Sequence, residues 1–344
     1  MMPADPWRLH GGAIAAAARS FGIPVSDWLD LSTGISPHSY PVPPLPLQTW
    51  HCLPDAGASA RLQAVAASYY GAPGPACVLQ VAGTQAAIQW LPRILGPAQD
   101  VAILAPTYAE HARAWAVAGH RVHTFARVAD IPPACGTLVI VNPNNPDGRV
   151  LTAAQVLALA ERHCVVVDEA FADVMPEVSV AGHCDRAPLI VLRSVGKFFG
   201  LAGLRLGFVI AAPALIAQLT EAQGPWAVSG PALAIGSEAL GDAGWTAAAR
   251  ASLARAAHRL DALLAAAGLT VIGGTDLFRL VTDADAQGLF EHLARNGILV
   301  RPFADQPQWL RFGLPGDDAA FARLEAALRS RPAVTLGLLR AVDT

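Results

Sequence analysis

Between residues 100 and 211 the sequence alternates short apolar segments with amphipathic ones, and this alternation restricts the possible folds more than any other feature. The apolar segments are rich in β-branched residues, as buried parallel strands are. They are Val101–Ala105, Arg121–Phe125, Thr137–Val141, Val165–Asp168, Leu189–Leu192 and Leu206–Ala211. Helical patterns occur at Thr84–Leu95, Ala109–Val117 and Ala153–Arg162, the last with Thr152 as its expected N-cap. The alternation predicts an α/β fold with a mostly parallel sheet flanked by helices.

The pattern changes after a long helix expected at Gly244–Ala267. Strand-like segments then interleave with two helices near Ala286–Asn296 and Asp318–Ser330, as in a small α+β domain. These strand-like segments are Thr270–Ile272, Leu277–Val281, Ile298–Val300 and Trp309–Phe312. Pro37–Pro46 is too rich in proline for a helix or a central strand and is expected at the surface. We therefore predict an N-terminal arm (residues 1–44), a large α/β domain (45–240) and a small C-terminal domain (241–344).

Composition excludes several functional classes. The 344 residues are 53% hydrophobic and 15% charged with a net charge of -3, so neither a disordered chain nor a basic nucleic-acid-binding face is expected. No apolar stretch reaches the roughly 18 residues of a membrane span. The Ala13–Ala18 run is short and follows no Lys/Arg cluster, which predicts a cytoplasmic protein without a secretory signal. Five scattered cysteines without a CxxC pair indicate reduced thiols and no metal site.

Lys197 is the only lysine in the chain. It lies among Gly, Phe and Leu residues, where partial desolvation would lower its pKa and make the amine nucleophilic. Ser194 and Arg205, three residues before it and eight after, are suited to hold an anion. A surface lysine that extends into solvent is the alternative. Because the chain has no other primary amine side chain, we favour the nucleophilic lysine over the surface lysine.

Three further segments are expected where open α/β sheets bind ligands, at the carboxyl ends of strands. Ala82–Gln85 is a glycine turn that opens into a helix and could hold a phosphate, although an ordinary helix start explains it too. Asn142–Gly148 could direct side-chain amides into a cleft; a structural turn explains its Pro and Gly residues, but its many Asn residues less well. Asp168 is costly to bury unless it meets a cation such as a protonated ring nitrogen, or caps a helix. For Glu169 we expect no functional role.

The ordered set of these motifs resembles the class I/II aminotransferase superfamily, the fold type I enzymes that depend on pyridoxal 5'-phosphate. The resemblance runs from about residue 30 to residue 330. The motifs are Gly83-Thr84-Gln85, Tyr108, Asn145-Pro146-Asp147-Gly148, Asp168-Glu169-Ala170-Phe171, and Ser194 with Lys197 and Arg205. The resemblance implies a large cofactor-binding α/β domain, a smaller α+β domain, and a cofactor that acts as an electron sink.

The resemblance also implies a role for each matching residue. Lys197 would form the internal aldimine, and Asp168 would keep the pyridinium nitrogen protonated. Asn145 would bond the ring hydroxyl oxygen and Tyr108 would stack on the ring. The cofactor phosphate would be held by Gly83, Thr84, Gln85, Ser194 and Arg205. Arg311, within Trp309–Gly313, matches the arginine that grips the substrate carboxylate.

The N-terminal arm is similar to that of threonine-phosphate decarboxylases of cobalamin biosynthesis, on the segments His10–Gly12, Trp28–Pro37 and Leu53–Asp55. This likeness implies decarboxylation of O-phospho-L-threonine to (R)-1-amino-2-propanol O-2-phosphate by a homodimer. His10 and the Gly34 backbone are candidates for the substrate phosphate, and Asn145 and Arg311 would also contact the substrate. A surface histidine is an equally good explanation of His10.

Three positions depart from the family pattern. Phe171 stands where many relatives have a tyrosine that bonds the ring oxygen, Asp147 replaces a threonine, and Leu53 replaces a tyrosine that reaches the neighbouring subunit's cofactor phosphate. Two alternatives to the decarboxylase stay open. One is a histidinol-phosphate-type aminotransferase with the same fold and cofactor. The other is a non-catalytic protein that retains the fold.

Overall fold

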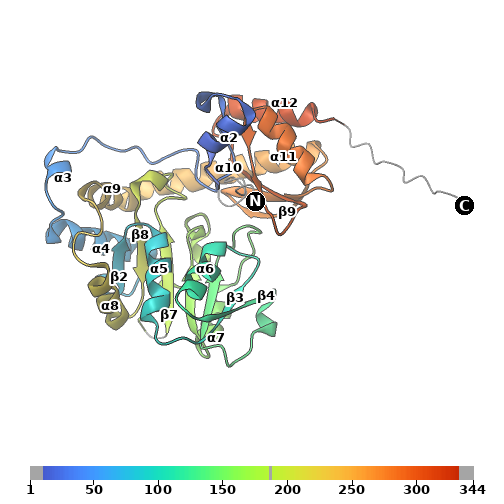
Figure 1. Ribbon diagram of the computed structural model, residues 1–344. Helices are drawn as coiled ribbons and strands as arrows, with labels where there is room; N and C mark the ends of the chain where they lie inside the picture. The colour runs from blue at the N-terminus through green and yellow to red at the C-terminus, as the bar shows by residue number, and fades with distance from the viewer. Residues whose placement is uncertain (1–10, 186–187, 333–344) are drawn as a thin grey trace, which may run out of the picture. The chain divides into compact units, whose positions relative to one another are not determined.

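The structure is a computed structural model that describes residues 11–185 and 188–332. Its chain separates into two compact units (Figure 1). Unit 1 comprises the described parts of Met1–Thr33, His258–Ile272 and Leu280–Thr344, and unit 2 comprises those of Gly34–Ala257 and Gly273–Arg279. The division into an arm and two domains after residues 44 and 240 stays a prediction.

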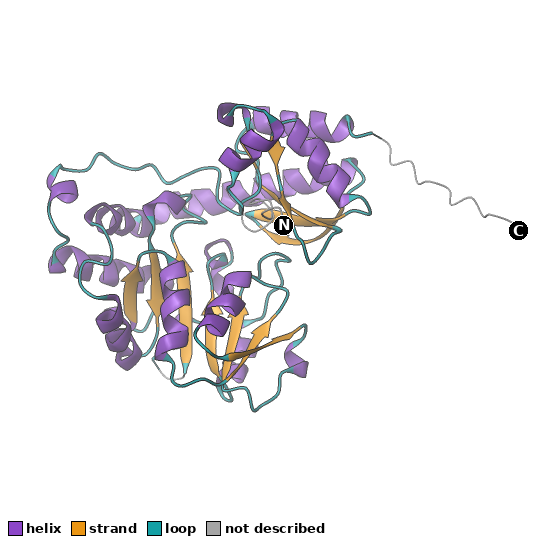
Figure 2. Cartoon of the chain, in the orientation of Figure 1, coloured by secondary structure: helices purple, strands orange, loops and turns teal. Residues whose placement is uncertain are grey.

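Unit 2 contains a seven-stranded sheet of order β2-β8-β7-β6-β5-β3-β4 (Figure 2). Its strands are β2 (Val78–Val81), β3 (Asp100–Leu104), β4 (Arg121–Phe125), β5 (Thr137–Val141), β6 (Cys164–Asp168), β7 (Leu189–Ser194) and β8 (Gly207–Ile210). The strands from β3 to β7 pair in parallel, and β8 runs antiparallel to both of its neighbours. The predicted mostly parallel sheet is therefore confirmed. The edge strand β2 was missed by the sequence pattern.

Helices cover this sheet because its strands are apolar on both faces. One face packs against α5 (Thr84–Ile94), α6 (Ala109–Val117) and α8 (Pro213–Gln223), and α5 and α6 lie in front of the sheet in Figure 1. The strand residues of that face alternate along each strand; they are Leu79, Val81, Val101, Ile103, Val139, Val166, Ile190, Leu192 and Val209. The intervening strand residues of the five inner strands are buried as well.

The remaining elements of unit 2 are mainly helical. They are α3 (Gln48–His51), α4 (Ala56–Tyr70), α7 (Ala153–Ala160), α9 (Gly230–Gly241) and α10 (Ala243–Ala266), whose last residues belong to unit 1. Thr152 caps α7 as predicted, in a capping box with Gln155. Residues 37–46 contain neither helix nor strand, in agreement with their proline content.

Unit 1 carries the predicted α+β pattern. The short strands β1 (Leu29–Asp30) and β11 (Ile298–Leu299) pair in parallel. Four strands form a sheet of order β12-β13-β10-β9, in which β12 (Arg301–Pro302) and β13 (Trp309–Gly313) are antiparallel. The other strands, which continue into residues of unit 2, are β9 (Thr270–Thr275) and β10 (Phe278–Thr282), and the helices are α2 (Ile14–Phe21), α11 (Ala286–Arg295) and α12 (Asp318–Arg329).

Two expectations from composition can be compared with this fold. All five cysteines are free thiols. Among the described residues no helix combines the length and the apolar character that crossing a membrane requires, and no cluster of three or more His, Cys, Asp or Glu residues could hold a metal ion.

Candidate active site

Lys197 lies on the connection between β7 and β8. Because these strands are antiparallel and Ser194 pairs with Gly207, the connection leaves and returns at the same end of the sheet, the carboxyl end of β6 and β7. Lys197 is half-buried, and its Nζ lies 5.5 Å from the ring centroid of Phe171. The following residues, Phe198 and Phe199, are fully buried and fix the backbone of the connection. Aromatic rings thus surround the connection that carries the lysine.

Asp168 ends β6 and is buried next to a histidine that the sequence analysis did not single out. Its Oδ2 lies 3.0 Å from Nε2 of His111, and its Oδ1 accepts the backbone N–H of Ala170 at 3.0 Å. His111 is buried on α6. These two contacts fix the plane of the carboxylate. The signal that could have found His111 is its position one helical turn after Tyr108, on the same face of α6.

A cradle for an anion lies where α5 begins. Gly83 has a φ of +79°, and no side chain caps the helix, so the backbone N–H groups of its first turn face outward. The guanidinium of Arg205 lies against this turn: a Cβ at Gly83 would stand 2.6 Å from Arg205 Nη2. On the other side, a Cβ at Gly207 would stand 2.8 Å from the backbone N of Thr84. Uncapped helical N–H groups beside a guanidinium are the donors that bind a phosphate.

Tyr108 immediately precedes α6 and is oriented by its neighbours. Its hydroxyl donates to Gln85 Oε1 at 3.3 Å, and Gln85 Nε2 in turn donates to Glu110 Oε2 at 3.3 Å. Its ring meets that of His111 edge-on, with centroids 6.1 Å apart. The Gln85 side chain thus orients Tyr108, so the predicted phosphate contact of Gln85 would come from its backbone N–H.

The Asn-rich loop after β5 owes most of its asparagines to structure. Asn142 bonds the backbone of Leu151 through both its amide nitrogen and its oxygen, each at 2.9 Å. Asn144 donates to Asp147 Oδ1 at 2.7 Å, which explains how Asp147 serves where relatives have threonine. These bonds define the loop that carries Asn145, which is half-buried.

Gly34 lies beside the lysine connection. A Cβ at Gly34 would stand 2.9 Å from Phe171 Cε1, the ring that Lys197 faces. Two residues later, the backbone N–H of Ser36 donates to the carbonyl of Lys197 at 2.9 Å. Phe171 itself is buried edge-on against Phe278, with centroids 5.1 Å apart. The structure therefore brings Gly34 and the Lys197 connection together.

In unit 1, Arg311 is buried and donates from Nη2 to the carbonyl of Ser32 at 2.8 Å. The register of β12 and β13 places Arg301 directly opposite it. Burial, together with the like charge of Arg301, lowers the pKa of Arg311 to about 9, while Asp30 acts in the opposite direction. Because a neighbouring negative charge favours the protonated guanidinium, a bound anion would raise this pKa again. Arg301 was not singled out from the sequence, because strand register cannot be read from a two-residue strand.

The remaining predicted residue, His10, lies outside the described residues. Two residues later, the backbone N–H of Gly12 donates to Ser32 Oγ at 2.8 Å, and the Ser32 carbonyl accepts from Arg311. The start of the described chain thus lies close to the buried arginine of unit 1.

Solved structures share this fold. The structure of L-threonine-O-3-phosphate decarboxylase from Porphyromonas gingivalis aligns with a TM-score of 0.73 at 19% identity, covering 87% of this chain and 98% of that chain. The structure of histidinol-phosphate aminotransferase from Sinorhizobium meliloti in complex with pyridoxal-5'-phosphate aligns with a TM-score of 0.77 at 20% identity, covering 96% and 98%. At these identities the likeness shows the fold alone.

Sequence relatives are much more similar. The threonine-phosphate decarboxylase of Pseudomonas aeruginosa is 46% identical over 327 residues, which are 93% of this chain and 96% of that protein. The protein of the same name from a Sinorhizobium species is 47% identical over 326 residues, covering 93% and 97%. Residues 47–328 match the family described as aminotransferase class I and II. This chain therefore belongs to the class I and II aminotransferase family.

Proposed function

We propose that this protein is a pyridoxal phosphate-dependent carboxy-lyase that decarboxylates O-phospho-L-threonine to (R)-1-amino-2-propanol O-2-phosphate in cobalamin biosynthesis. The observation that carries the proposal is the identity of 46–47%, over nearly the full length of both partners, with two threonine-phosphate decarboxylases. The structure is compatible with the proposal, because all residues expected to contact the cofactor lie in the same compact unit, unit 2.

The residues present fit pyridoxal phosphate. The group needs a primary amine for its aldehyde, donors for its phosphate and a carboxylate for its ring nitrogen. Lys197 is the only lysine, the start of α5 with Ser194 and Arg205 is a phosphate cradle, and Asp168 is a buried carboxylate. When bound, the cofactor supplies the electron sink for the bond that breaks.

The protein's own groups would orient this chemistry. Asp168 would hold a proton on the ring nitrogen by its negative charge, and His111 would fix the carboxylate for that task. Tyr108, oriented through Gln85, would lie on the ring face, and Asn145 would donate to the ring oxygen that Phe171 cannot reach by hydrogen bonding. The protein therefore contributes position and electrostatics.

The choice between decarboxylation and transamination depends on substrate orientation, because the bond that breaks is the one aligned with the electron sink. We propose that Arg311 binds the substrate carboxylate. Arg301, directly opposite it on the neighbouring strand, would add a second cation for the substrate phosphate. His10 and the Gly34 backbone stay candidates for the same phosphate.

One incubation tests the function. The protein is reconstituted with pyridoxal phosphate and supplied with O-phospho-L-threonine, with and without 2-oxoglutarate. We expect CO₂ and aminopropanol phosphate in equal amounts, independent of 2-oxoglutarate, and no glutamate. A Lys197→Ala variant serves as the inactive control. Formation of glutamate without CO₂ would overturn the proposal.

A histidinol-phosphate-type aminotransferase is the second candidate, favoured by the fold shared with the Sinorhizobium meliloti enzyme. It predicts glutamate formation when histidinol phosphate and 2-oxoglutarate are supplied together. A non-catalytic protein of this fold would produce neither product and would show no lysine-dependent absorbance of the cofactor.

We also propose that the protein is a cytoplasmic homodimer. Three large apolar side chains near α3, those of Leu47, Trp50 and Leu53, are each more than 60% exposed, which is costly for a monomer. Leu53 also lines a cavity of about 390 Å³ with residues of α4 and α9. Light scattering on the wild type and on Trp50→Glu tests the dimer, and a wild-type monomer at micromolar concentration would disprove it. Cell fractionation tests the location.

A further inference from the structure

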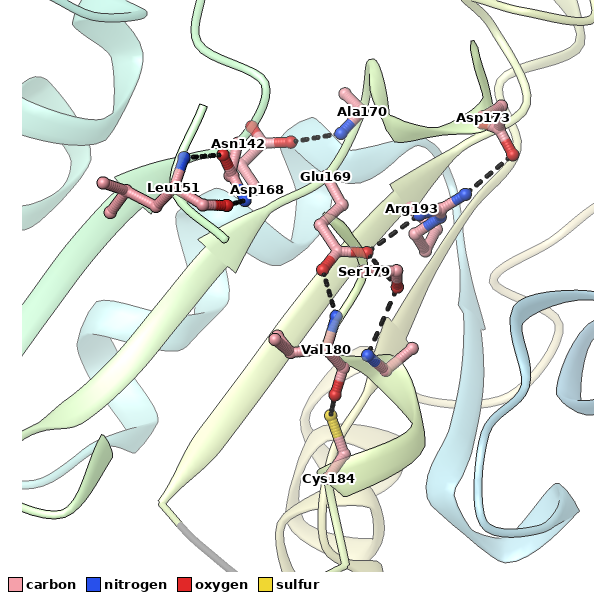
Figure 3. A network of polar contacts seen from close by, with 11 residues as sticks. Asn142, Leu151, Asp168, Glu169, Ala170, Asp173, Ser179, Val180, Cys184 and Arg193 are labelled. Atoms are coloured by element: carbon pink, nitrogen blue, oxygen red, sulfur yellow. Dashed lines mark hydrogen bonds and ion pairs between the residues drawn. The ribbon is translucent and has the colours of Figure 1, made fainter. Parts of the chain in front are cut away.

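A group of buried charges joins β7 to the segment that follows β6 (Figure 3). Arg193 donates from Nη1 to Glu169 Oε2 at 2.8 Å and from Nη2 to Asp173 Oδ1 at 2.7 Å. Glu169 and Asp173 are 0% exposed and Arg193 is 3% exposed. None of the three has a task in the proposed function, so the presence of three buried charges needs another explanation.

Two of these charged residues are adjacent in sequence to residues proposed to bind the cofactor. Glu169 directly follows Asp168, and Arg193 directly precedes Ser194. The backbone N–H of Glu169 donates to the carbonyl of Leu192 at 2.9 Å, which extends the ladder between β6 and β7 by one residue. Because successive side chains of a strand point to opposite faces, Asp168 and Ser194 share the face covered by α5 and α6, while Glu169 and Arg193 share the other. The ion pair therefore joins the ends of the two strands that carry the cofactor residues.

The partners of Arg193 are themselves fixed. Glu169 accepts the hydroxyl of Ser179 at 2.6 Å and the backbone N–H of Val180 at 2.9 Å (Figure 3). Arg250 of α10 donates to the carbonyl of Asp173 at 2.6 Å. These bonds hold the carboxylate of Glu169 and the backbone of Asp173 in place.

Arg193 also packs against an aromatic ring. Its guanidinium lies 4.4 Å from the ring centroid of Tyr70, the last residue of α4. It thus connects α4 to the ends of both strands. A single side chain with three fixed contacts can hold those ends in one register.

Stability alone does not explain such a group. Burial raises the pKa of Glu169 even though Arg193 and two further donors oppose the shift, so desolvation is the largest effect on this carboxyl. Buried ion pairs often contribute no more stability than apolar residues of the same volume, whereas the loss of one partner is strongly destabilising. Unlike apolar packing, the hydrogen bonds of Arg193 have a fixed direction, so they define where the two carboxylates lie relative to β7.

We propose that Arg193 is a positioning residue: through Glu169 and Asp173 it fixes the ends of β6 and β7, so that the Asp168 carboxylate and the Lys197 amine keep the separation that the cofactor ring requires. This inference rests on the proposed function for the identity of the cofactor. Without Arg193, Asp168 and Ser194 shift. The cofactor then binds more weakly, and its ring nitrogen is less cationic, which raises the pKa of the linkage between Lys197 and the cofactor.

The test compares Arg193→Met and Arg193→Lys with Leu62→Ala as a control. Leu62 is fully buried on α4, and its truncation leaves a cavity that lowers stability without touching the charged group. For each reconstituted protein we measure the thermal midpoint, the dissociation constant of pyridoxal phosphate, and the pKa of the lysine linkage from its absorbance. A fourth readout is hydrogen exchange of residues 168–171 and 192–197 in the cofactor-free protein.

For Arg193→Met we expect the dissociation constant to rise about tenfold, as for residues that orient ligand-binding side chains. The pKa of the linkage should rise by about one unit, the size of shift produced when a neighbouring charge moves. Arg193→Lys keeps the charge but not the two-pronged geometry and should fall between Met and wild type. Leu62→Ala should lower the thermal midpoint alone, with hydrogen exchange of the two segments unchanged.

The outcomes separate this inference from the proposed function. A wild type without lysine-dependent absorbance contradicts the proposed function. A wild type with that absorbance, combined with an Arg193→Met variant that matches Leu62→Ala in cofactor affinity, linkage pKa and hydrogen exchange, overturns the positioning role. If Arg193→Met does not fold, Glu169→Gln carries the same test, because it removes the ion pair between Arg193 and Glu169 at nearly constant side-chain volume and leaves the pair with Asp173 in place.

Discussion

His111 Nε2 lies 3.0 Å from Asp168 Oδ2, and both side chains are buried at the end of β6. Through this contact α6 takes part in orienting the carboxylate that we propose for the cofactor's ring nitrogen. The second oxygen of Asp168 is held by the backbone of Ala170. The Asp168 carboxylate therefore cannot rotate freely, and its orientation is set by the fold.

We expect His111→Phe to lower kcat/KM by about tenfold to a hundredfold, the value of a hydrogen bond to a charged group. The cofactor should also bind more weakly, because the carboxylate loses its orientation. Steady-state kinetics and cofactor titration measure both effects. His163→Phe is the matched control, since His163 is a buried histidine that bonds only a backbone carbonyl, that of Cys135 at 2.7 Å. Equal losses in the two variants would contradict a role for His111 in the site.

Borohydride reduction of the reconstituted protein should attach the cofactor to one tryptic peptide, the one that contains Lys197. The chain offers no other lysine, so no competing ε-amine exists. Mass spectrometry of the digest identifies the labelled peptide. The Lys197→Arg variant should remain unlabelled, and a label found on it would show that another group holds the cofactor.

Gly83→Ala should weaken binding of pyridoxal phosphate by about tenfold or more, because its Cβ would displace the Arg205 guanidinium from the phosphate cradle. Gly224→Ala is the control for the backbone conformation alone. Gly224 has φ and ψ of +71° and -178°, close to the +79° and +154° of Gly83, but no atom lies within 4 Å of its Cβ position. Both variants should lose about 1–3 kcal/mol of stability, because this backbone conformation is open almost only to glycine. Only Gly83→Ala should lose cofactor affinity, which fluorescence titration measures.

Arg311→Gln should raise KM for O-phospho-L-threonine by about tenfold to a hundredfold, because the charged contact with the carboxylate is lost. Arg301→Gln should raise KM for the same substrate but have little effect with L-threonine, which lacks the phosphate. Kinetics with the two substrates give this comparison directly. An equal effect of Arg301→Gln on both substrates would exclude a contact between Arg301 and the phosphate.

The pair of Asp283 and Arg331 predicts an acid-dependent loss of stability. Two hydrogen bonds of 2.8 Å join the side chains, and the pair lowers the pKa of Asp283. Since the folded-state pKa lies below that of the unfolded chain, the stabilisation is present above about pH 4 and is lost as the pH falls through the folded value. Asp283→Asn should therefore unfold at a lower temperature than wild type at pH 7, and the difference should narrow below pH 4. A difference that is constant with pH would contradict the assignment.

Much of unit 2 could be predicted from the sequence because most of its strands are apolar and alternate with amphipathic helices. The strands β3 to β8 lie within two residues of their expected bounds. The strand β2 was missed because the polar Gln80 interrupts its short apolar run, whereas the equally short β8 is apolar throughout and was predicted. Local patterns decide where an element lies, but a single polar residue hides a strand of this length.

Residues that act through tertiary contacts could not be found in this way. The role of His111 depends on how α6 crosses the end of β6, and that of Arg301 depends on the register of two short strands. The asparagines of the loop after β5 show the opposite error. Their number indicated function, yet Asn142 and Asn144 bind the backbone and side chains of their own loop or its neighbours. The composition of a loop does not distinguish a residue that stabilises the loop by hydrogen bonds from one whose side chain is available to a ligand.

The reversed direction of β8 has a consequence for how this enzyme can vary. The single connection between β7 and β8, from Ser194 to Gly207, contains Ser194, Lys197 and Arg205. Its two ends are paired, Ser194 with Gly207. An insertion or deletion of even one residue there would displace Lys197 and the two residues that we propose for the cofactor phosphate at once. We therefore expect this connection to keep a constant length among homologues with the same chemistry, while loops at the opposite rim of the sheet lengthen and shorten freely.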